Sequence, residues 1–131
     1  MGEVHEGGCL CGAVRYRAHG ALRPVIACHC SQCRKQSGHF GAYTSVMRAE
    51  DLELSVTEGL AWYQSSAAAE RGFCKRCGSA LFWKPLDRDR ISLSAGSLDG
   101  ATGLRIAQHI YCADKGDYYD IADGVEQRAA D

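Results

Sequence analysis

The segment FCKRCGSALF, Phe73 to Phe82, sets two cysteines two residues apart beside a glycine and an apolar run. In this pattern a strand enters, Cys74 and Cys77 turn inward to one metal ion, and the chain folds back. Gly78 allows the positive φ that this reversal needs. A redox-active CxxC of the thioredoxin type requires a βαβ setting, which the flanking sequence lacks. The segment therefore predicts half of a zinc site between two strands.

Two other cysteine groups can complete this site. They are CLC and CHCSQC, which contain Cys9, Cys11, Cys28, Cys30 and Cys33, while Cys112 stands alone. Spacing alone allows either group to give Cys74 and Cys77 the two further sulfurs of a closed zinc site. A trio within six residues can hold an ion without help, whereas a single Cys-x-Cys pair cannot. This difference favours CLC as the partner of CKRC and leaves the trio with an open fourth position, as in catalytic zinc sites.

Composition favours metal over disulfides as the use of these thiols. The polar N-terminal stretch MGEVHEGG and the lack of any long apolar run indicate neither a signal peptide nor a membrane span. We therefore expect a cytoplasmic protein, and in a reducing compartment eight cysteines in 131 residues are better explained by metal. The net charge of −1, without a basic cluster, argues against nucleic acid as a partner.

Alternating apolar and polar residues predict short strands along most of the chain. The expected strands lie at 14–18, 40–46, 52–56, 60–63, 79–83, 91–95 and 104–111. Only SQCRKQSG (31–38) and SSAAAERG (65–72) suggest helix, each of one or two turns. No linker, repeat or low-complexity segment interrupts the pattern. We therefore expect a mainly β fold with very little helix, in one domain over residues 1–131.

Three motifs carry a resemblance to a known family. GGCLCGAVRY, CHCSQCRKQSG and FCKRCGSALFW, in this order and spacing, resemble the glutathione-dependent formaldehyde-activating enzymes, a family that includes the centromere protein V domain. The resemblance covers about residues 8–124. It departs near the C-terminus, where Tyr118 stands in place of a common tryptophan, Glu126 in place of a proline and Arg128 in place of an aromatic residue. These changes fall on the expected lining of the substrate pocket and leave the cysteines untouched.

The resemblance implies a fold and two zinc ions per chain. The fold would be small twisted antiparallel sheets clamped by a structural zinc on four cysteines. The implied ligands of that zinc are Cys9, Cys11, Cys74 and Cys77. A second, labile zinc would be held by Cys28, Cys30 and Cys33, and this second ion need not be present in every chain.

The resemblance also implies a reaction at the trio. The sulfur of glutathione, or of another small thiol, would take the open position and attack formaldehyde, giving S-hydroxymethylglutathione, with a carbon–sulfur lyase reaction as the reverse. Arg34 and Lys35 follow the trio directly and could anchor the carboxylates of glutathione, although two exposed cations on a helical turn explain them equally well. His29, between two ligands, is expected to point away from their ion, and His39 and His109 could lie near it.

A binding module without catalysis is the alternative interpretation. In that case both metal sites would be structural, and a protein ligand would close the trio's fourth position. Cys112 could be that ligand, a resolving thiol, or a small buried hydrophobe, which is the commonest role of a free cysteine.

Overall fold

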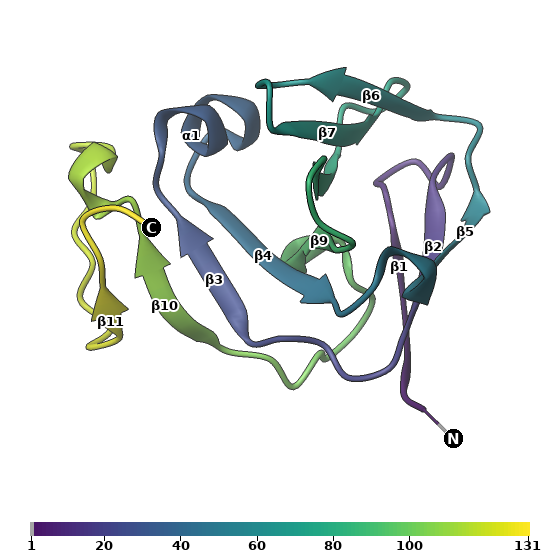
Figure 1. Ribbon diagram of the computed structural model, residues 1–131, viewed down its shortest axis with the longest axis horizontal. Helices are drawn as coiled ribbons and strands as arrows, with labels where there is room; N and C mark the ends of the chain where they lie inside the picture. The colour runs from purple at the N-terminus through teal and green to yellow at the C-terminus, as the bar shows by residue number, and fades with distance from the viewer. Residues whose placement is uncertain (1) are drawn as a thin grey trace. The chain divides into compact units, whose positions relative to one another are not determined.

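The computed structural model describes residues 2–131, which divide into two compact units (Figure 1). The first unit comprises the described residues up to Arg23 together with Thr44–Thr102, and the second comprises Pro24–Tyr43 and Gly103–Asp131. The CLC and CKRC cysteines fall in the first unit, and the CHCSQC cysteines fall in the second. Each predicted metal site therefore lies within a single unit.

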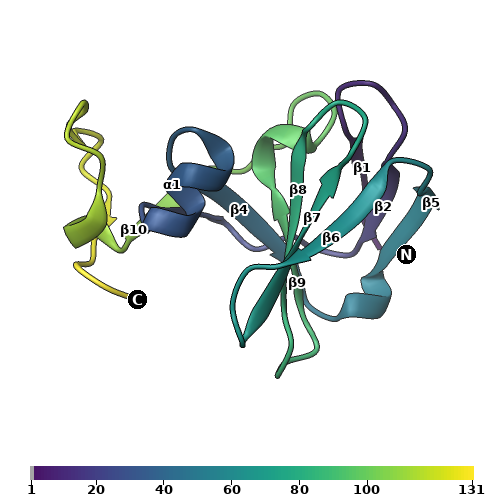
Figure 2. The ribbon, with the colours of Figure 1, turned by 90° about the horizontal axis from the view of Figure 1, so that it is seen from above.

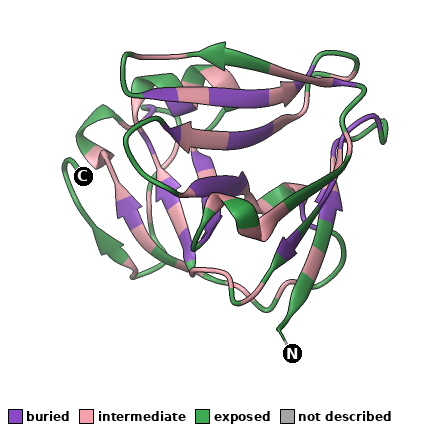
Figure 3. Cartoon of the chain, turned by 45° about the vertical axis from the view of Figure 1, so that its right-hand side comes forward, coloured by how far each residue is buried: buried purple, intermediate pink, exposed green. Residues whose placement is uncertain are grey.

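The first unit contains a three-stranded antiparallel sheet. Its order is β1 (Val4–Gly8), β2 (Arg15–His19) and β5 (Leu52–Val56). On β2 the side chains of Tyr16 and Ala18 are buried, whereas Arg17 and His19 are exposed. Figure 3 shows buried and exposed positions alternating along several strands. The alternation in the sequence thus correctly predicted both the strand and its buried face.

A second antiparallel sheet of this unit is a meander of four consecutive strands. The strands are β6 (Leu60–Gln64), β7 (Ala69–Cys74), β8 (Ala80–Pro85) and β9 (Ile91–Ser94). They lie side by side in Figure 2. The Phe82 ring meets the Tyr16 ring edge-on, with 5.5 Å between centroids, so the two sheets share a core that also buries Leu93 and Val14.

The sheet of the second unit is mixed. Its order is β11 (Glu126–Gln127), β10 (Ile106–Ile110), β3 (Val25–Cys28) and β4 (Gly41–Val46), the last of which runs on into the first unit. β3 and β4 are antiparallel, but β10 pairs in parallel with both β3 and β11. The prediction of antiparallel sheets is therefore right for most strand pairs and wrong for these two. Alternation identifies strands but carries no information on their partners.

One short α-helix, α1 (Ser31–Ser37), follows the first two cysteines of the trio, as predicted. It ends at Gly38, which adopts φ 86° and donates its N–H to the Arg34 carbonyl at 2.9 Å. The other helical elements are single 3-10 turns, η1 (Ala49–Asp51), η2 (Ala95–Ser97) and η3 (Cys112–Asp114). Among residues 2–131, no helix has the length and apolar character needed to cross a membrane.

The predicted helix at 65–72 is wrong. Ser66 to Ala68 form a bend, and β7 begins at Ala69. Alanine favours helix intrinsically, but an isolated helix of two turns is marginal. In the folded chain β7 instead pairs on both sides, with β6 and with β8. Tertiary pairing therefore overrides the local preference of the alanines.

Candidate metal centres

Two loops of the first unit bring four cysteines together. Cys9 and Cys11 lie in the turn between β1 and β2, where Gly12 has φ 85° and the Cys9 N–H donates to the Val14 carbonyl at 3.0 Å. Cys74 ends β7, and Cys77 lies in the tight turn that leads to β8. Each loop is a reversal between antiparallel strands, so each can turn two sulfurs to the same point.

The second loop has the knuckle geometry that the sequence predicts. The Gly78 N–H donates to the Cys74 carbonyl at 2.7 Å, and the Cys74 N–H donates to the Ser79 carbonyl at 3.0 Å. Gly78 takes φ 81°, in the left-handed region that favours glycine. The short reversal places both sulfurs of the CKRC pair on the inside of the turn.

The four sulfurs have the spacing of a tetrahedral metal site. The Cys11 sulfur lies 3.7 Å from those of both Cys9 and Cys74. The ligand atoms of all four cysteines lie within 4.8 Å of one another. Sulfurs at 2.3 Å from a zinc ion are about 3.8 Å apart in a tetrahedron. The residues present therefore fit a zinc ion held by Cys9, Cys11, Cys74 and Cys77.

Hydrogen bonds to Cys9 and Cys77 favour the thiolate form of these two sulfurs. The backbone N–H of Val14 donates to the Cys9 sulfur at 3.2 Å. The Ser79 hydroxyl lies 3.2 Å from the Cys77 sulfur, and its hydrogen bond is the main cause that lowers the pKa of Cys77 to about 5. The backbone of Gly59 packs so closely against Cys74 that a Cβ atom at position 59 would lie 2.7 Å from the Cys74 sulfur. The loops thus present sulfurs ready to bind a cation.

The second cysteine group lies wholly in the second unit. Cys28 ends β3, Cys30 caps the start of α1, and Cys33 lies buried in its first turn. The Cys33 N–H donates to the Cys30 sulfur at 3.4 Å. The three sulfurs lie within 4.8 Å of one another, and among residues 2–131 no fourth cysteine, histidine or carboxylate joins them. Cys112 therefore lies outside the group, which offers three ligands of its own.

The sulfurs of the trio share protons with one another. The pKa of Cys30 is lowered because Cys28 and Cys33 hydrogen-bond to its thiolate. Hydrogen bonds with Cys30 and Cys33 raise the pKa of Cys28. A bound cation favours the thiolate form of every ligand. Metal binding to the trio is therefore expected to release protons.

A chain of hydrogen bonds runs through His29, the residue between Cys28 and Cys30. His29 and His109 are buried, 1% and 3% exposed. His29 Nε2 lies 2.9 Å from His109 Nδ1, and His109 Nε2 lies 2.8 Å from Asp123 Oδ2. The second ring nitrogen of His29 hydrogen-bonds to the Tyr119 hydroxyl. Both nitrogens of His29 are thus engaged away from the trio, as its position between two ligands predicts, and burial lowers its pKa to about 4.

The sequence did not identify two residues of this hydrogen-bonded chain, Asp123 and Tyr119. Asp123 lies among several acidic residues of the C-terminal segment, and Tyr119 follows the Tyr118 of the altered motif. Neither spacing nor alternation distinguishes them from their neighbours. The available signal was the pair of histidines, His29 beside the cysteines and His109 in a strand, whose partners only the fold reveals.

The two cations after the trio differ in their surroundings. Lys35 is exposed on α1. Arg34 is half-buried, and its Nε is buried without a hydrogen-bond partner among the described residues. Its positive charge also lowers the pKa of Tyr119, although burial of the phenol dominates and raises that pKa overall. Arg34 is thus better placed than Lys35 to receive a buried anionic group.

His39 lies on the exposed side of this region. Its Nδ1 hydrogen-bonds to the Tyr118 hydroxyl at 2.7 Å, and its ring lies 4.6 Å from that of Tyr119. Tyr118 is 60% exposed. The residue that replaces the family's tryptophan therefore lies near one end of the hydrogen-bonded chain.

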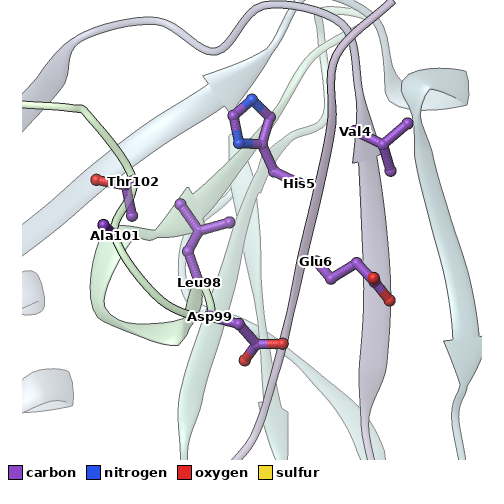
Figure 4. A pocket seen from close by; sticks show the side chains of 7 residues that line it. All are labelled: Val4, His5, Glu6, Leu98, Asp99, Ala101 and Thr102. Carbon is purple, nitrogen blue, oxygen red and sulfur yellow. The ribbon is translucent and has the colours of Figure 1, made fainter.

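Two depressions in the first unit lack the set of side chains that a metal site needs. A depression of about 290 Å³ is lined by Val4, His5, Glu6, Leu98, Asp99, Ala101 and Thr102 (Figure 4). It contains no sulfur, and the Asp99 carboxylate is already paired with Arg15 at 2.6 Å. A second depression of about 390 Å³ touches Cys9 but is otherwise lined mainly by serine, glycine and alanine. The first depression thus offers no thiol and the second only that of Cys9, so neither is a further thiol site.

Comparison with known proteins places these cysteine groups in a family. The family model described as glutathione-dependent formaldehyde-activating enzyme matches residues 4–114. A Schizosaccharomyces pombe protein named an uncharacterized lyase is 30% identical over 129 residues, covering 97% of this chain and 92% of its own. A Halomonas elongata protein, named provisionally as a glutathione-dependent formaldehyde-activating enzyme, is 38% identical over 84 residues. The match covers 59% of this chain and 54% of the Halomonas protein.

A solved structure supports the fold. The crystal structure of a Rhodobacter sphaeroides protein superposes with a TM-score of 0.60 at 27% identity, covering 75% of this chain and 91% of that one. The family match extends over the three cysteine motifs and most of the strands. The chain belongs to the family of glutathione-dependent formaldehyde-activating enzymes.

Proposed function

We propose that the protein is a zinc-dependent carbon–sulfur lyase that forms and cleaves S-hydroxymethylglutathione. The observation that carries this proposal is the trio of Cys28, Cys30 and Cys33, which among the described residues has no fourth protein ligand. Zinc is the proposed metal because thiolate ligands in tetrahedral arrangement select it. Cys9, Cys11, Cys74 and Cys77 would hold a structural zinc, since four protein ligands leave no open position.

The reaction joins two small molecules. Cys28, Cys30 and Cys33 would hold the zinc ion, which would supply an open position that favours the thiolate form of an incoming thiol. The glutathione sulfur forms a bond to the carbon of formaldehyde, the C=O double bond becomes a single bond, and a proton ends on the oxygen. Cleavage runs the same steps backwards. No redox partner is needed, because the oxidation states of carbon and sulfur balance within the adduct.

Arg34 would bind a carboxylate of glutathione. Its guanidinium has an unused, buried Nε, and a charge-assisted hydrogen bond to a carboxylate would satisfy it. Lys35 would add a weaker, solvent-screened attraction from the helix surface. The two cations follow Cys33 directly, so a thiol bound at the trio would have its carboxylates within reach of this turn.

The setting that we propose follows from the same residues. A small thiol is the partner, and neither nucleic acid nor membrane is required. The eight cysteines, all among the described residues, form no disulfide, which suits a reducing compartment such as the cytoplasm. We further propose that residues 1–131 act as one zinc-binding domain, with one ion for each of its two compact units.

The test compares two single-thiol variants. Cys30→Ser removes a trio ligand, and Cys112→Ser removes the cysteine outside both groups. Formation of S-hydroxymethylglutathione, followed by exchange NMR above the spontaneous rate, should be lost in Cys30→Ser and kept in Cys112→Ser. Zinc per chain should fall from two towards one only in Cys30→Ser. Full turnover by Cys30→Ser, or two ions that do not respond to glutathione, would instead support a binding module with two structural metals.

A further inference from the structure

We propose that Tyr119, His29, His109 and Asp123 form a positioning chain that holds the sulfurs of the trio together while the second metal ion exchanges. The inference rests on metal binding by the trio, which is part of the proposed function. It adds a role for residues that the proposed chemistry leaves unused. The chain lies entirely in the second unit, as does the trio.

The chain is continuous from the surface into the unit. Asp123 has a side chain that is 42% exposed, whereas the side chain of His109 is 4% exposed. The His29 ring packs against the rings of Phe40 and Tyr119, with centroids 4.9 and 5.7 Å away. Each histidine uses both ring nitrogens within the chain. No ring nitrogen of either residue is left for water or for metal.

The carboxylate at one end gives the chain a direction. An ionised carboxylate can only accept, so His109 Nε2 carries the proton in their hydrogen bond. In a neutral ring Nδ1 is then the acceptor, so it receives the Nε2–H of His29. His29 Nδ1 in turn accepts the hydroxyl proton of Tyr119. All three hydrogen bonds thus point from Tyr119 towards Asp123.

The fixed ring of His29 constrains its two neighbours. The sulfurs of Cys28 and Cys30 lie within 4.8 Å of each other, while the His29 ring between them in the sequence is engaged by Tyr119 and His109. The His29 backbone N–H also donates to the Ile110 carbonyl at 3.0 Å. The segment is therefore held by its backbone and by both nitrogens of one side chain. Without an ion, these contacts keep the sulfurs in place.

The first test uses two adjacent tyrosines. Tyr119→Phe removes only the hydroxyl that bonds to His29, and Tyr118→Phe removes a hydroxyl that bonds to His39 instead. Zinc affinity is measured for both sites by competition with a chelator. Loss of a group that orients a metal site commonly weakens binding tenfold or more. We expect the second zinc to bind about tenfold more weakly in Tyr119→Phe, with no change in Tyr118→Phe.

The four-cysteine group serves as an internal control. It lies in the other unit, so its zinc affinity should stay unchanged in Tyr119→Phe. Equal weakening at both groups would mean a general loss of folding and would overturn the inference. If Tyr119→Phe bound the second zinc with wild-type affinity, the positioning role would be overturned and the proposed function would stand. A wild-type protein that binds no second ion would remove the proposed function as well.

A second test reads the direction of the chain. Asp123 Oδ1 also accepts the Val125 N–H at 3.0 Å. In Asp123→Asn the amide oxygen keeps that contact, so the amide NH₂ turns to His109. His109 Nε2 must then accept, and the protons of both histidines move to Nδ1. We expect ¹⁵N NMR of the imidazoles to show this change of tautomer in His109 and His29. Unchanged tautomers would contradict the proposed direction.

Discussion

The sulfur of Cys11 lies 3.7 Å from that of Cys74, although the two residues are 63 positions apart in the chain. A metal ion bound by both sulfurs would join the turn between β1 and β2 to the turn between β7 and β8. Closing a loop of this length removes about 4 kcal/mol of chain entropy from the unfolded state. The four-cysteine group is therefore expected to stabilise the first unit rather than to take part in chemistry.

Cys74→Ser should lower the free energy of unfolding by about 4 kcal/mol, because the loop is no longer closed by metal. Urea unfolding of the zinc-loaded protein measures this change. Cys112→Ser is the control, since Cys112 belongs to neither group. Equal stability of Cys74→Ser and the wild-type protein would mean that no ion links the two loops.

Gly59→Ala should disturb the same site from the side. Its new Cβ would lie 2.7 Å from the Cys74 sulfur and 2.9 Å from the Ala13 Cβ. Overpacking of this kind costs about 1–3 kcal/mol, and the displaced sulfur should also weaken zinc binding. Gly96→Ala is the matched control, because a Cβ there meets nothing within 4 Å. The melting temperature and the zinc content of both variants decide the point.

The local patterns of the sequence predicted the cysteine groups and most strands, because a thiol pair and an alternating strand are each readable within ten residues. Ser65–Gly72 shows where such reading fails, since the pairing of β7 with β6 and β8 outweighs helix propensity. The sequence did not predict the parallel pairing of β10 with β3 for the same reason. Partners distant in sequence leave no local pattern.

The hydrogen-bonded chain illustrates the limit at the candidate site. His29 and Tyr119 are 90 positions apart, and His109 and Asp123 are 14 apart. The sequence predicted that the His29 side chain points away from the trio, because His29 lies between two expected metal ligands, Cys28 and Cys30. It could not show that the ring has buried partners at both nitrogens, since these come from β10 and from the C-terminal segment.

Stability should fall in alkaline solution because of Tyr16. Burial raises the pKa of this phenol to about 12, whereas in the unfolded chain it is about 10. Above pH 10 the unfolded state loses the proton and the folded state keeps it, so unfolding becomes easier as pH rises towards 12. Between pH 9 and pH 11 a pKa difference of this size lowers stability by about 1.3 kcal/mol, roughly half of its full effect, and Tyr16→Phe should remove that fall. Unfolding measured at pH 9 and pH 11 tests it, and equal slopes for both proteins would contradict it.

Arg34 and Lys35 should differ in their effect on glutathione use. Arg34→Gln removes the half-buried guanidinium whose Nε lacks a partner, and Lys35→Gln removes an exposed ammonium on the same helix. A charge-assisted hydrogen bond contributes about 1.5 kcal/mol or more, so KM for glutathione should rise about tenfold in Arg34→Gln. The value of kcat should stay near that of the wild-type protein, because the contact is made equally in the bound thiol and in the transition state. Lys35→Gln should raise KM by at most about fivefold, as exposed cations contribute about 0 to 1 kcal/mol. Equal effects of the two substitutions would show that the thiol meets the outer surface of α1 rather than the half-buried guanidinium.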